Sequence, residues 1–425
     1  MCSTPVKDFG YNIQSVKKLT MSMTVLIDKS ERIFMKLEDV SIVKTKLLGS
    51  LFTKNPVRVL GHDGAYSVPL SDDRVFWSFG DTLIGSERRG YDPKTINIDD
   101  WLTKDAWVKE NILMISNSAL IAEADDIQRL METGFEYYVH QRTMEKENFT
   151  EAREIIPVPD ALRSGERRTA FWPMDGVDID GKLYVYYLTV KCEPMTLYAT
   201  GITKSVQPYE MFTRLPSSAI ESSDDVLEAT ETPYVWWNNV SGKRGQEIPN
   251  FGTAVLKKVI NGYVYVYGSK VEKTKEDTIH VVCLARVRKD DVEDITKYQY
   301  LIESPSKQNG SIPVWGEDPV GSASIFEGNA NELSVSYNPY LKKYLAVYST
   351  VQIHSPEIHM RFSENPAGPW SDPITVFEPR RSCDVDFCYA AKEHPEYSEE
   401  HGKRIYLTYV SHQRYFPELL EMEFE

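Results

Sequence analysis

The sequence lacks the cysteine content of a disulfide-rich or zinc-binding protein. It has five cysteines in 425 residues, and no two of them are arranged as CxxC. An odd number of widely spaced cysteines predicts neither a disulfide framework nor a zinc site. Only Cys383 and Cys388 are close enough in the sequence to approach each other, and their bonding is left open. The five are Cys2, Cys192, Cys283, Cys383 and Cys388.

Positive charge and long hydrophobic runs are also scarce. The formal net charge is −15, and no Lys/Arg cluster offsets it locally. This charge repels phosphate backbones and anionic lipids, so we expect no nucleic-acid or membrane partner. The longest apolar run near the start, residues 21–27, is short and contains Ser and Thr, so we expect no signal peptide in the sequence as given. The sequence therefore predicts a cytoplasmic protein, although a secreted protein without its leader would look the same.

Hydrophobic residues and tyrosines, by contrast, are plentiful. Hydrophobic residues make up 41% of the chain, charged residues make up 26%, and there are 25 tyrosines. This composition is typical of a globular protein with many β-strands and a large core. A length of 425 residues fits several average domains, but it also fits one large all-β domain.

A repeated pattern decides between these possibilities. Turn residues followed by a short strand with aromatic or β-branched residues occur five times, and a strand-like run precedes each turn. Most copies are followed by a third such run, for example at 197–203, 279–287 and 358–362. Three or four antiparallel strands make one blade of a β-propeller. The turn-and-strand copies occupy residues 72–79, 180–187, 261–267, 341–348 and 402–409, and the preceding runs occupy residues 65–70, 177–179, 253–259, 333–337 and 389–391.

The pattern predicts an all-β fold, a single five-bladed β-propeller over residues 1–425. The alternative is a β-sandwich with long loops, because short alternating strands also describe that fold. We expect residues 1–54 to supply a strand that closes the ring. Residues 91–165 are expected to form a partly helical insertion after the first hairpin, with helices at 98–110 and 122–134.

The first hairpin carries the candidate catalytic residues. Its turn is centred near Asp72, so Asp63 and Asp81, each nine residues away, are predicted neighbours across antiparallel strands. The other four units have Thr189, Ser269, Thr350 or Ser411 at the position of Asp81, and only the first has an acid. Two close carboxyl groups resist joint ionisation, which provides the acid and the base needed for glycosidic cleavage. The alternative is that both aspartates only cap local turns.

The same counting brings other residues to the channel mouth. Glu332 aligns with Asp63 and is a candidate third acid, although it also fits a solvated strand end. Trp172 and Phe251 are predicted apolar walls suited to sugar rings, and His62 is a candidate substrate contact or a turn residue. These four are therefore predicted substrate-binding residues: His62, Trp172, Phe251 and Glu332.

No metal or other cofactor is predicted. An acidic run in the second unit, formed by Asp175, Asp178 and Asp180, has the oxygen ligands that Ca²⁺ prefers. A hydrated turn explains the same run equally simply, and we favour it.

Residues 59–70 and 76–82 closely resemble the opening of a bacterial family formerly classed as a domain of unknown function. Members of that family are recognised as endo-D-arabinanases, which form glycoside hydrolase family 183. The likeness extends to residues 363–371, 389–396 and 404–409, and it covers roughly residues 55–425. It implies a five-bladed propeller with catalytic aspartates at the positions of Asp63 and Asp81, in agreement with the repeat. It further implies a furanoside substrate similar to D-arabinan.

Three functions remain open from the sequence. The first is a glycoside hydrolase that uses Asp63 and Asp81 as acid and as nucleophile or base. The second is a non-catalytic carbohydrate-binding propeller, which would tolerate Asp81→Asn because an amide still accepts hydrogen bonds. The third is a glycoside phosphorylase, for which Arg88 and Arg89 are the candidate phosphate-binding residues.

Overall fold

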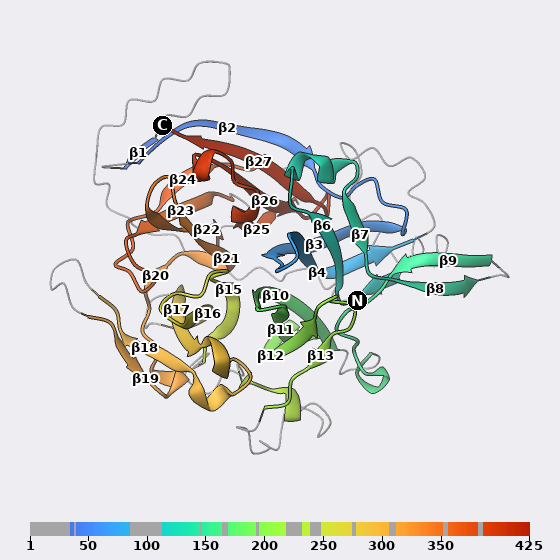
Figure 1. Cartoon of the computed structure of the whole chain (residues 1–425), viewed down its shortest axis with the longest axis horizontal. Coiled ribbons are helices and arrows are strands. Elements are labelled where there is room, and N and C mark those ends of the chain that lie inside the picture. Colours follow the sequence, from blue (N-terminus) through green and yellow to red (C-terminus); the bar gives the residue numbers. More distant parts are fainter. Residues whose placement is uncertain are drawn as a thin grey trace.

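The computed structural model describes twelve stretches of the chain: 35–37, 40–85, 113–144, 147–163, 169–192, 195–217, 232–238, 248–273, 278–305, 312–351, 356–380 and 386–425. Within them, five antiparallel sheets stand around a common centre (Figure 1). This arrangement confirms the five-bladed β-propeller and not the sandwich, whose two sheets would face each other. No helix in these stretches is long and apolar enough to cross a membrane.

Each sheet begins with a strand at the centre of the disc and continues outward. The first blade contains β3 (Val59–Pro69), β4 (Arg74–Ile84), β5 (Leu113–Ile115), β6 (Ser118–Glu123) and β7 (Phe135–Tyr137). The second contains β10 (Thr169–Ile179), β11 (Lys182–Cys192), β12 (Met195–Val206), β13 (Thr213–Arg214) and β14 (Trp237–Asn238). The third contains β15 (Asn250–Val255), β16 (Tyr263–Lys273), β17 (Thr278–Arg288), β18 (Gln299–Glu303), β19 (Val314–Gly316) and β20 (Phe326–Glu327).

The last two blades complete the disc. The fourth contains β21 (Asn329–Asn338), β22 (Lys343–Thr350), β23 (Ile358–Ser363) and β24 (Ile374–Phe377). The fifth contains β25 (Cys388–Glu393), β26 (Arg404–Ser411), β27 (Pro417–Phe424), β2 (Val40–Ser50) and β1 (Met35–Leu37). Short 3₁₀ helices connect strands at Ile127–Met131, Asp160–Leu162, Thr232–Tyr234, Lys289–Asp291, Ile295–Lys297, Pro319–Gly321, Pro395–Tyr397 and Glu400–Gly402.

Both ends of the described chain meet in the fifth blade. Strand β2 pairs antiparallel with β27, from Ile42 opposite Phe424 to Ser50 opposite Glu418. The five inner strands, β3, β10, β15, β21 and β25, contact one another in sequence, and β25 contacts β3 again. Residues before position 55 thus supply a strand that joins the two ends of the ring.

Turn chemistry explains the hairpins between the first two strands of the second and third blades. Asp180 and Gly181 have φ values of 53° and 80°, and Asn261 and Gly262 have values of 52° and 80°. Two successive positive φ values define the tight turn whose twist matches antiparallel strands, and Asn-Gly and Asp-Gly adopt it at low cost.

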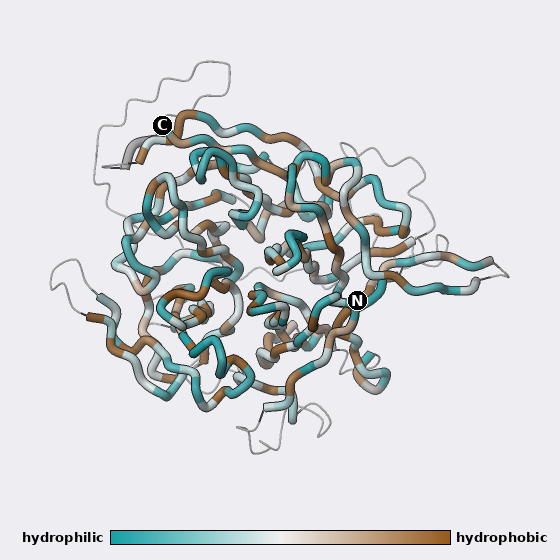
Figure 2. The backbone as a smooth tube through the Cα atoms, viewed as in Figure 1, coloured by the Kyte–Doolittle hydropathy of each residue, from teal (hydrophilic) through white to brown (hydrophobic). Residues whose placement is uncertain are grey.

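The strands that follow these turns are buried on both faces. In β4 all residues after Arg74 are buried, because neighbouring blades pack against both sides of each sheet. Trp77 is fully buried there and donates its indole N–H to the Tyr397 hydroxyl at 3.2 Å. Hydrophobic and hydrophilic segments are intermixed across the whole disc (Figure 2).

The predicted insertion differs from expectation. The helix expected at 122–134 is wrong, because residues 118–123 form β6, which pairs with β4 as a strand of the first blade. Only Ile127–Met131 turn as a 3₁₀ helix there. The charged residues of this stretch suggest a helix surface, but pairing with a buried strand overrides that local preference. The other expected helix, at 98–110, lies outside the described residues. A hairpin of β8 (Val139–Met144) and β9 (Glu147–Ala152) projects from the disc (Figure 1).

Candidate functional site

A β-bulge brings Asp63 and Asp81 to facing positions of the first hairpin. His62 lies opposite Thr82 and Gly64 lies opposite Phe79, so Asp63 alone faces both Gly80 and Asp81. A bulge of this kind bends the strand and redirects the side chains beside it. The spacing from the turn therefore predicts the correct partners.

The other inner strands have a similar irregularity at the same level. The pairing register shifts after Pro173 in β10, Phe251 in β15, Asn329 in β21 and Tyr389 in β25. Each inner strand thus has a few residues outside the regular hydrogen-bonded ladder, and these residues lie around the centre of the disc. Bulges frequently flank active sites for this reason.

Asp81 is held by a tryptophan of the second blade. The indole N–H of Trp172 donates a hydrogen bond to Asp81 Oδ1 at 3.0 Å. Asp81 is only 8% exposed. Burial raises the pKa of Asp81 to about 7, the Trp172 hydrogen bond opposes this rise, and the negative charge of Glu154 adds to it. Asp81 therefore changes charge near neutral pH.

Asp63 is held by two tyrosines of the fifth blade. The hydroxyls of Tyr389 and Tyr415 donate to Asp63 Oδ2 at 3.3 and 3.4 Å. Burial raises the pKa of Asp63 well above its usual value, and the charges of Asp81 and Glu332 raise it further. The hydrogen bond from Tyr389 acts in the opposite direction. Asp63 consequently retains its proton to higher pH than an ordinary aspartate.

Glu332 is the third acid near this pair, and it is ion-paired. Lys392 Nζ lies 2.6 Å from Glu332 Oε2, and the lysine side chain is only 2% exposed. Lys392 also donates to the carbonyl oxygens of Gly64 and Ala390 at 3.2 and 3.1 Å. The structure thus brings together Asp63, Asp81, Glu332 and Trp172 from three different blades.

Two other predicted contacts lie in the core. His62 is fully buried, stacks on Phe79 with ring centroids 3.7 Å apart, and bonds to the Tyr137 hydroxyl at 2.9 Å. Burial lowers the pKa of His62 to about 3. Phe251 is also fully buried and packs against Trp237 and Tyr300.

The substrate contact expected of His62 and Phe251 is therefore not available, because neither has exposed surface in the structure. Successive side chains of a strand point to opposite faces, so the side chain of His62 points away from the face that carries Asp63. Counting residues misplaces Phe251 because the bulges differ in size between blades: Phe251 lies opposite Gly268 and not opposite Ser269.

Sequence reasoning missed Tyr389, Tyr415 and Lys392. The fifth unit has a longer turn, with Pro395–Tyr397 and Glu400–Gly402 inserted as 3₁₀ helices, so counting from its last aromatic does not align it. A search for polar residues over the whole strand before this turn, β25, would have found Tyr389 and Lys392. Tyr415 follows β26, and no repeat position marks it.

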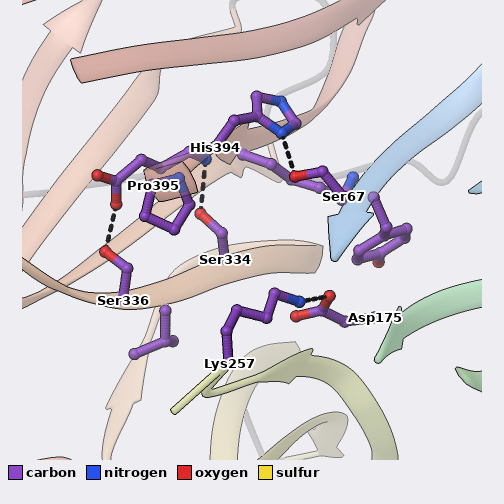
Figure 3. A pocket seen from close by; sticks show the side chains of 11 residues that line it. Ser67, Asp175, Lys257, Ser334, Ser336, His394 and Pro395 are labelled. Atoms are coloured by element: carbon purple, nitrogen blue, oxygen red, sulfur yellow. Dashed lines mark hydrogen bonds and ion pairs between the residues drawn. The ribbon is translucent and has the colours of Figure 1, made fainter. Parts of the chain in front are cut away.

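A small pocket beside the inner strands is lined mostly by polar and charged residues, and all five blades contribute to it (Figure 3). Lys257 is ion-paired with Asp175, and Ser67 is hydrogen-bonded to His394 Nδ1 at 2.7 Å. Ser336 donates to Glu393, whose pKa burial raises to about 7. These ion pairs and hydrogen bonds connect neighbouring blades.

The acidic run in the second unit does not converge on one point. Asp175 binds Lys257, Asp178 accepts from Ser71 and Tyr209, and Asp180 pairs with Lys289 at the surface. Arg88, Arg89 and Cys383, which figure in other predictions, lie outside the described residues.

Comparisons with known proteins agree with this fold. The family model described as a domain of unknown function, DUF4185, matches residues 52–420. A Bacteroides ovatus ATCC 8483 protein provisionally described as a hydrolase is 15% identical, with a TM-score of 0.56 and coverage of 94% of this chain and 96% of that one. At this identity the likeness shows the fold alone. No curated protein matches the chain.

Two further solved structures are more distant. An endo-arabinase from Bacteroides thetaiotaomicron VPI-5482 is 11% identical, covers 87% of this chain and 96% of that one, and has a TM-score of 0.43. A GH43_1 enzyme from Xanthomonas citri is 12% identical, covers 89% and 91%, and has a TM-score of 0.47.

Proposed function

Because the chain belongs to the DUF4185 family, whose model spans residues 52–420, and has two facing aspartates at its centre, we propose that it is a glycoside hydrolase. Asp63 and Asp81 cleave the glycosidic bond. The resemblance in residues 59–70 and 76–82 favours a furanoside substrate similar to D-arabinan. The observation that supports hydrolysis most directly is the meeting of the two carboxyl groups in different electrostatic surroundings.

These surroundings assign a role to each aspartate. Asp63 keeps its proton because burial and two neighbouring acids disfavour its charged form, so it serves as the general acid. Two tyrosine hydroxyls occupy Asp63 Oδ2, which leaves Oδ1 to carry the proton. The Trp172 N–H favours the ionised form of Asp81, so Asp81 serves as nucleophile or base. The exposed part of the Trp172 ring is expected to contact the sugar.

We propose retention of anomeric configuration. The two carboxyl groups come from facing positions of one hairpin, and a short separation favours attack by a carboxylate rather than by an intervening water. Proton NMR of the first products would show the starting anomer if this is correct. The opposite anomer would assign Asp81 the role of base for a water.

The test of function is hydrolysis of a panel of aryl furanosides and pyranosides together with D-arabinan and L-arabinan. We expect release of the aryl group from a furanoside and of reducing ends from D-arabinan. Binding of these sugars without turnover would replace the hydrolase by a carbohydrate-binding propeller. Turnover that requires inorganic phosphate would instead identify a phosphorylase.

The two protonation states predict a bell-shaped dependence of kcat/KM on pH. Activity falls on the acid side as Asp81 becomes protonated, with a midpoint near its pKa of about 7. It falls on the alkaline side as Asp63 loses its proton. A profile recorded between pH 5 and 10 tests this, and full activity at pH 5 would contradict the roles assigned to the two aspartates.

We expect Trp172→Phe to move the acid side of this profile upward by about one pH unit. The indole N–H stabilises the charged carboxylate of Asp81, so its loss raises the pKa of Asp81 further. The measurement is kcat/KM against pH. Trp236→Phe is a matched control, because Trp236 is fully buried and donates to the Leu215 carbonyl, away from the acids. An unchanged profile for Trp172→Phe would show that the hydrogen bond does not tune Asp81.

A further inference from the structure

Lys392 is a buried cation that connects three blades beside Asp63. Its Nζ donates to Glu332 on β21, to the Gly64 carbonyl on β3 and to the Ala390 carbonyl on its own strand. It also lies 4.1 Å from the centroid of the Tyr66 ring. An ammonium group has three donors, and all three are used here. Lys392 therefore has no hydrogen left for a substrate.

Burying the positive charge of Lys392 costs free energy, and packing alone does not explain it. A buried ion pair often contributes little net stability compared with apolar residues of similar volume. Lys392 nevertheless binds the Gly64 carbonyl, next to Asp63, and the carboxyl group of Glu332. Its position suggests that it acts through these neighbours.

The charged and titratable groups that face Asp63 come from every element packed around it. Asp81 approaches from β4, Glu332 from β21, and Tyr389 and Lys392 from β25. Tyr66 lies on the same strand, and Tyr415 follows β26. Among these groups two are acids and only Lys392 is a base. The charge that acts on Asp63 therefore depends on Lys392 as well as on Asp81 and Glu332.

We propose that Lys392 is a positioning residue, which forms with Glu332 a compensating charge pair that fixes the pH range in which the aspartates work. The pH range concerns the hydrolase activity proposed above. The pairing itself can be tested without that activity.

The sign of each effect follows from charge alone. Removing the positive charge of Lys392 favours protonation of every nearby carboxyl group, so Lys392→Met shifts both sides of the pH profile to higher pH. Removing the negative charge of Glu332 has the opposite effect, so Glu332→Gln shifts both sides to lower pH. Each shift is expected to be about one pH unit for Asp63, which is closer to the pair, and smaller for Asp81. In the double variant the two changes cancel.

The experiment measures kcat/KM against pH for the wild type, Lys392→Met, Glu332→Gln and the double variant. We expect opposite shifts in the two single variants and a profile within about 0.3 units of the wild type in the double variant, since the two opposite shifts of about one unit cancel. Lys204→Met is the matched control. It removes one positive charge from an ion pair with Glu293 on another blade and should leave the profile unchanged. A purely structural role would lower activity at all pH values without opposite shifts, and that result would overturn the proposal.

A second measurement separates this proposal from the hydrolase proposal. Carbon-13 NMR of protein labelled at the aspartate carboxyl carbon follows the titration of Asp63 directly, with Asp63→Asn to assign its signal. Opposite displacements of this titration in the two single variants would support the charge pair even if no sugar is hydrolysed. Equal or absent displacements would overturn it, whatever the activity. Glu332→Gln alone decides the sign if Lys392→Met does not fold.

Discussion

We expect Asp81→Asn and Asp63→Asn each to lower kcat/KM by about 10³-fold or more, a loss of about 4 kcal/mol in transition-state stabilisation. Asn has nearly the shape of Asp, but it neither donates an acidic proton nor attacks as a carboxylate. Because the two groups act on the same bond, the double variant should lose little more than either single variant. The measurement uses the substrate of the panel that the wild type hydrolyses best.

The first hairpin provides its own control for this prediction. Asp73 lies at the opposite end of the hairpin, exposed, with φ of 63°, a value that Asn adopts readily. Asp73→Asn should therefore leave activity and folding unchanged. Sugar binding that survives in both active-site variants, with activity reduced less than tenfold, would contradict catalysis by these aspartates.

The number of blades could be predicted from the sequence because turn chemistry is local. Asp180-Gly181 and Asn261-Gly262 predict their hairpins because these residues readily adopt positive φ values, which few other residues do. The pairing of Asp63 with Asp81 follows from the same regularity, because a short turn fixes which residues face each other.

Features that depend on tertiary contacts could not be predicted in this way. Residues 122–134 carry the charges of a helix surface, yet β6 forms because β4 offers it a buried edge. Phe251 follows the counting rule but points into the core, because the bulge of β15 differs from that of β3. Lys392 and Tyr415 reach Asp63 only through ring closure, which brings the fifth blade beside the first.

Gly80 is expected to be essential for the position of Asp63. It faces Asp63 across the bulge, and a methyl group at this position would overlap Asp63 Oδ1 and approach the ring of Trp172 to 3.8 Å. Gly80→Ala therefore displaces the carboxyl group of Asp63 without removing any catalytic atom. A displacement of about 1 Å in a reacting group costs about 10²-fold in rate. We expect a fall of this size in kcat, with KM little changed, measured by steady-state kinetics.

A double-mutant cycle shows whether the effect acts through Asp63. In an Asp63→Ala background no carboxyl group opposes the new methyl group, so Gly80→Ala should cost little further activity. Gly321→Ala is the matched control, because the nearest atom to its added methyl group is Ile302 Cγ2 at 3.8 Å, an ordinary contact on the third blade. If Gly80→Ala lowers activity equally in both backgrounds, the loss comes from the strand itself. Equal activity of Gly80→Ala and the wild type would mean that the bulge does not hold Asp63 against β4 during catalysis.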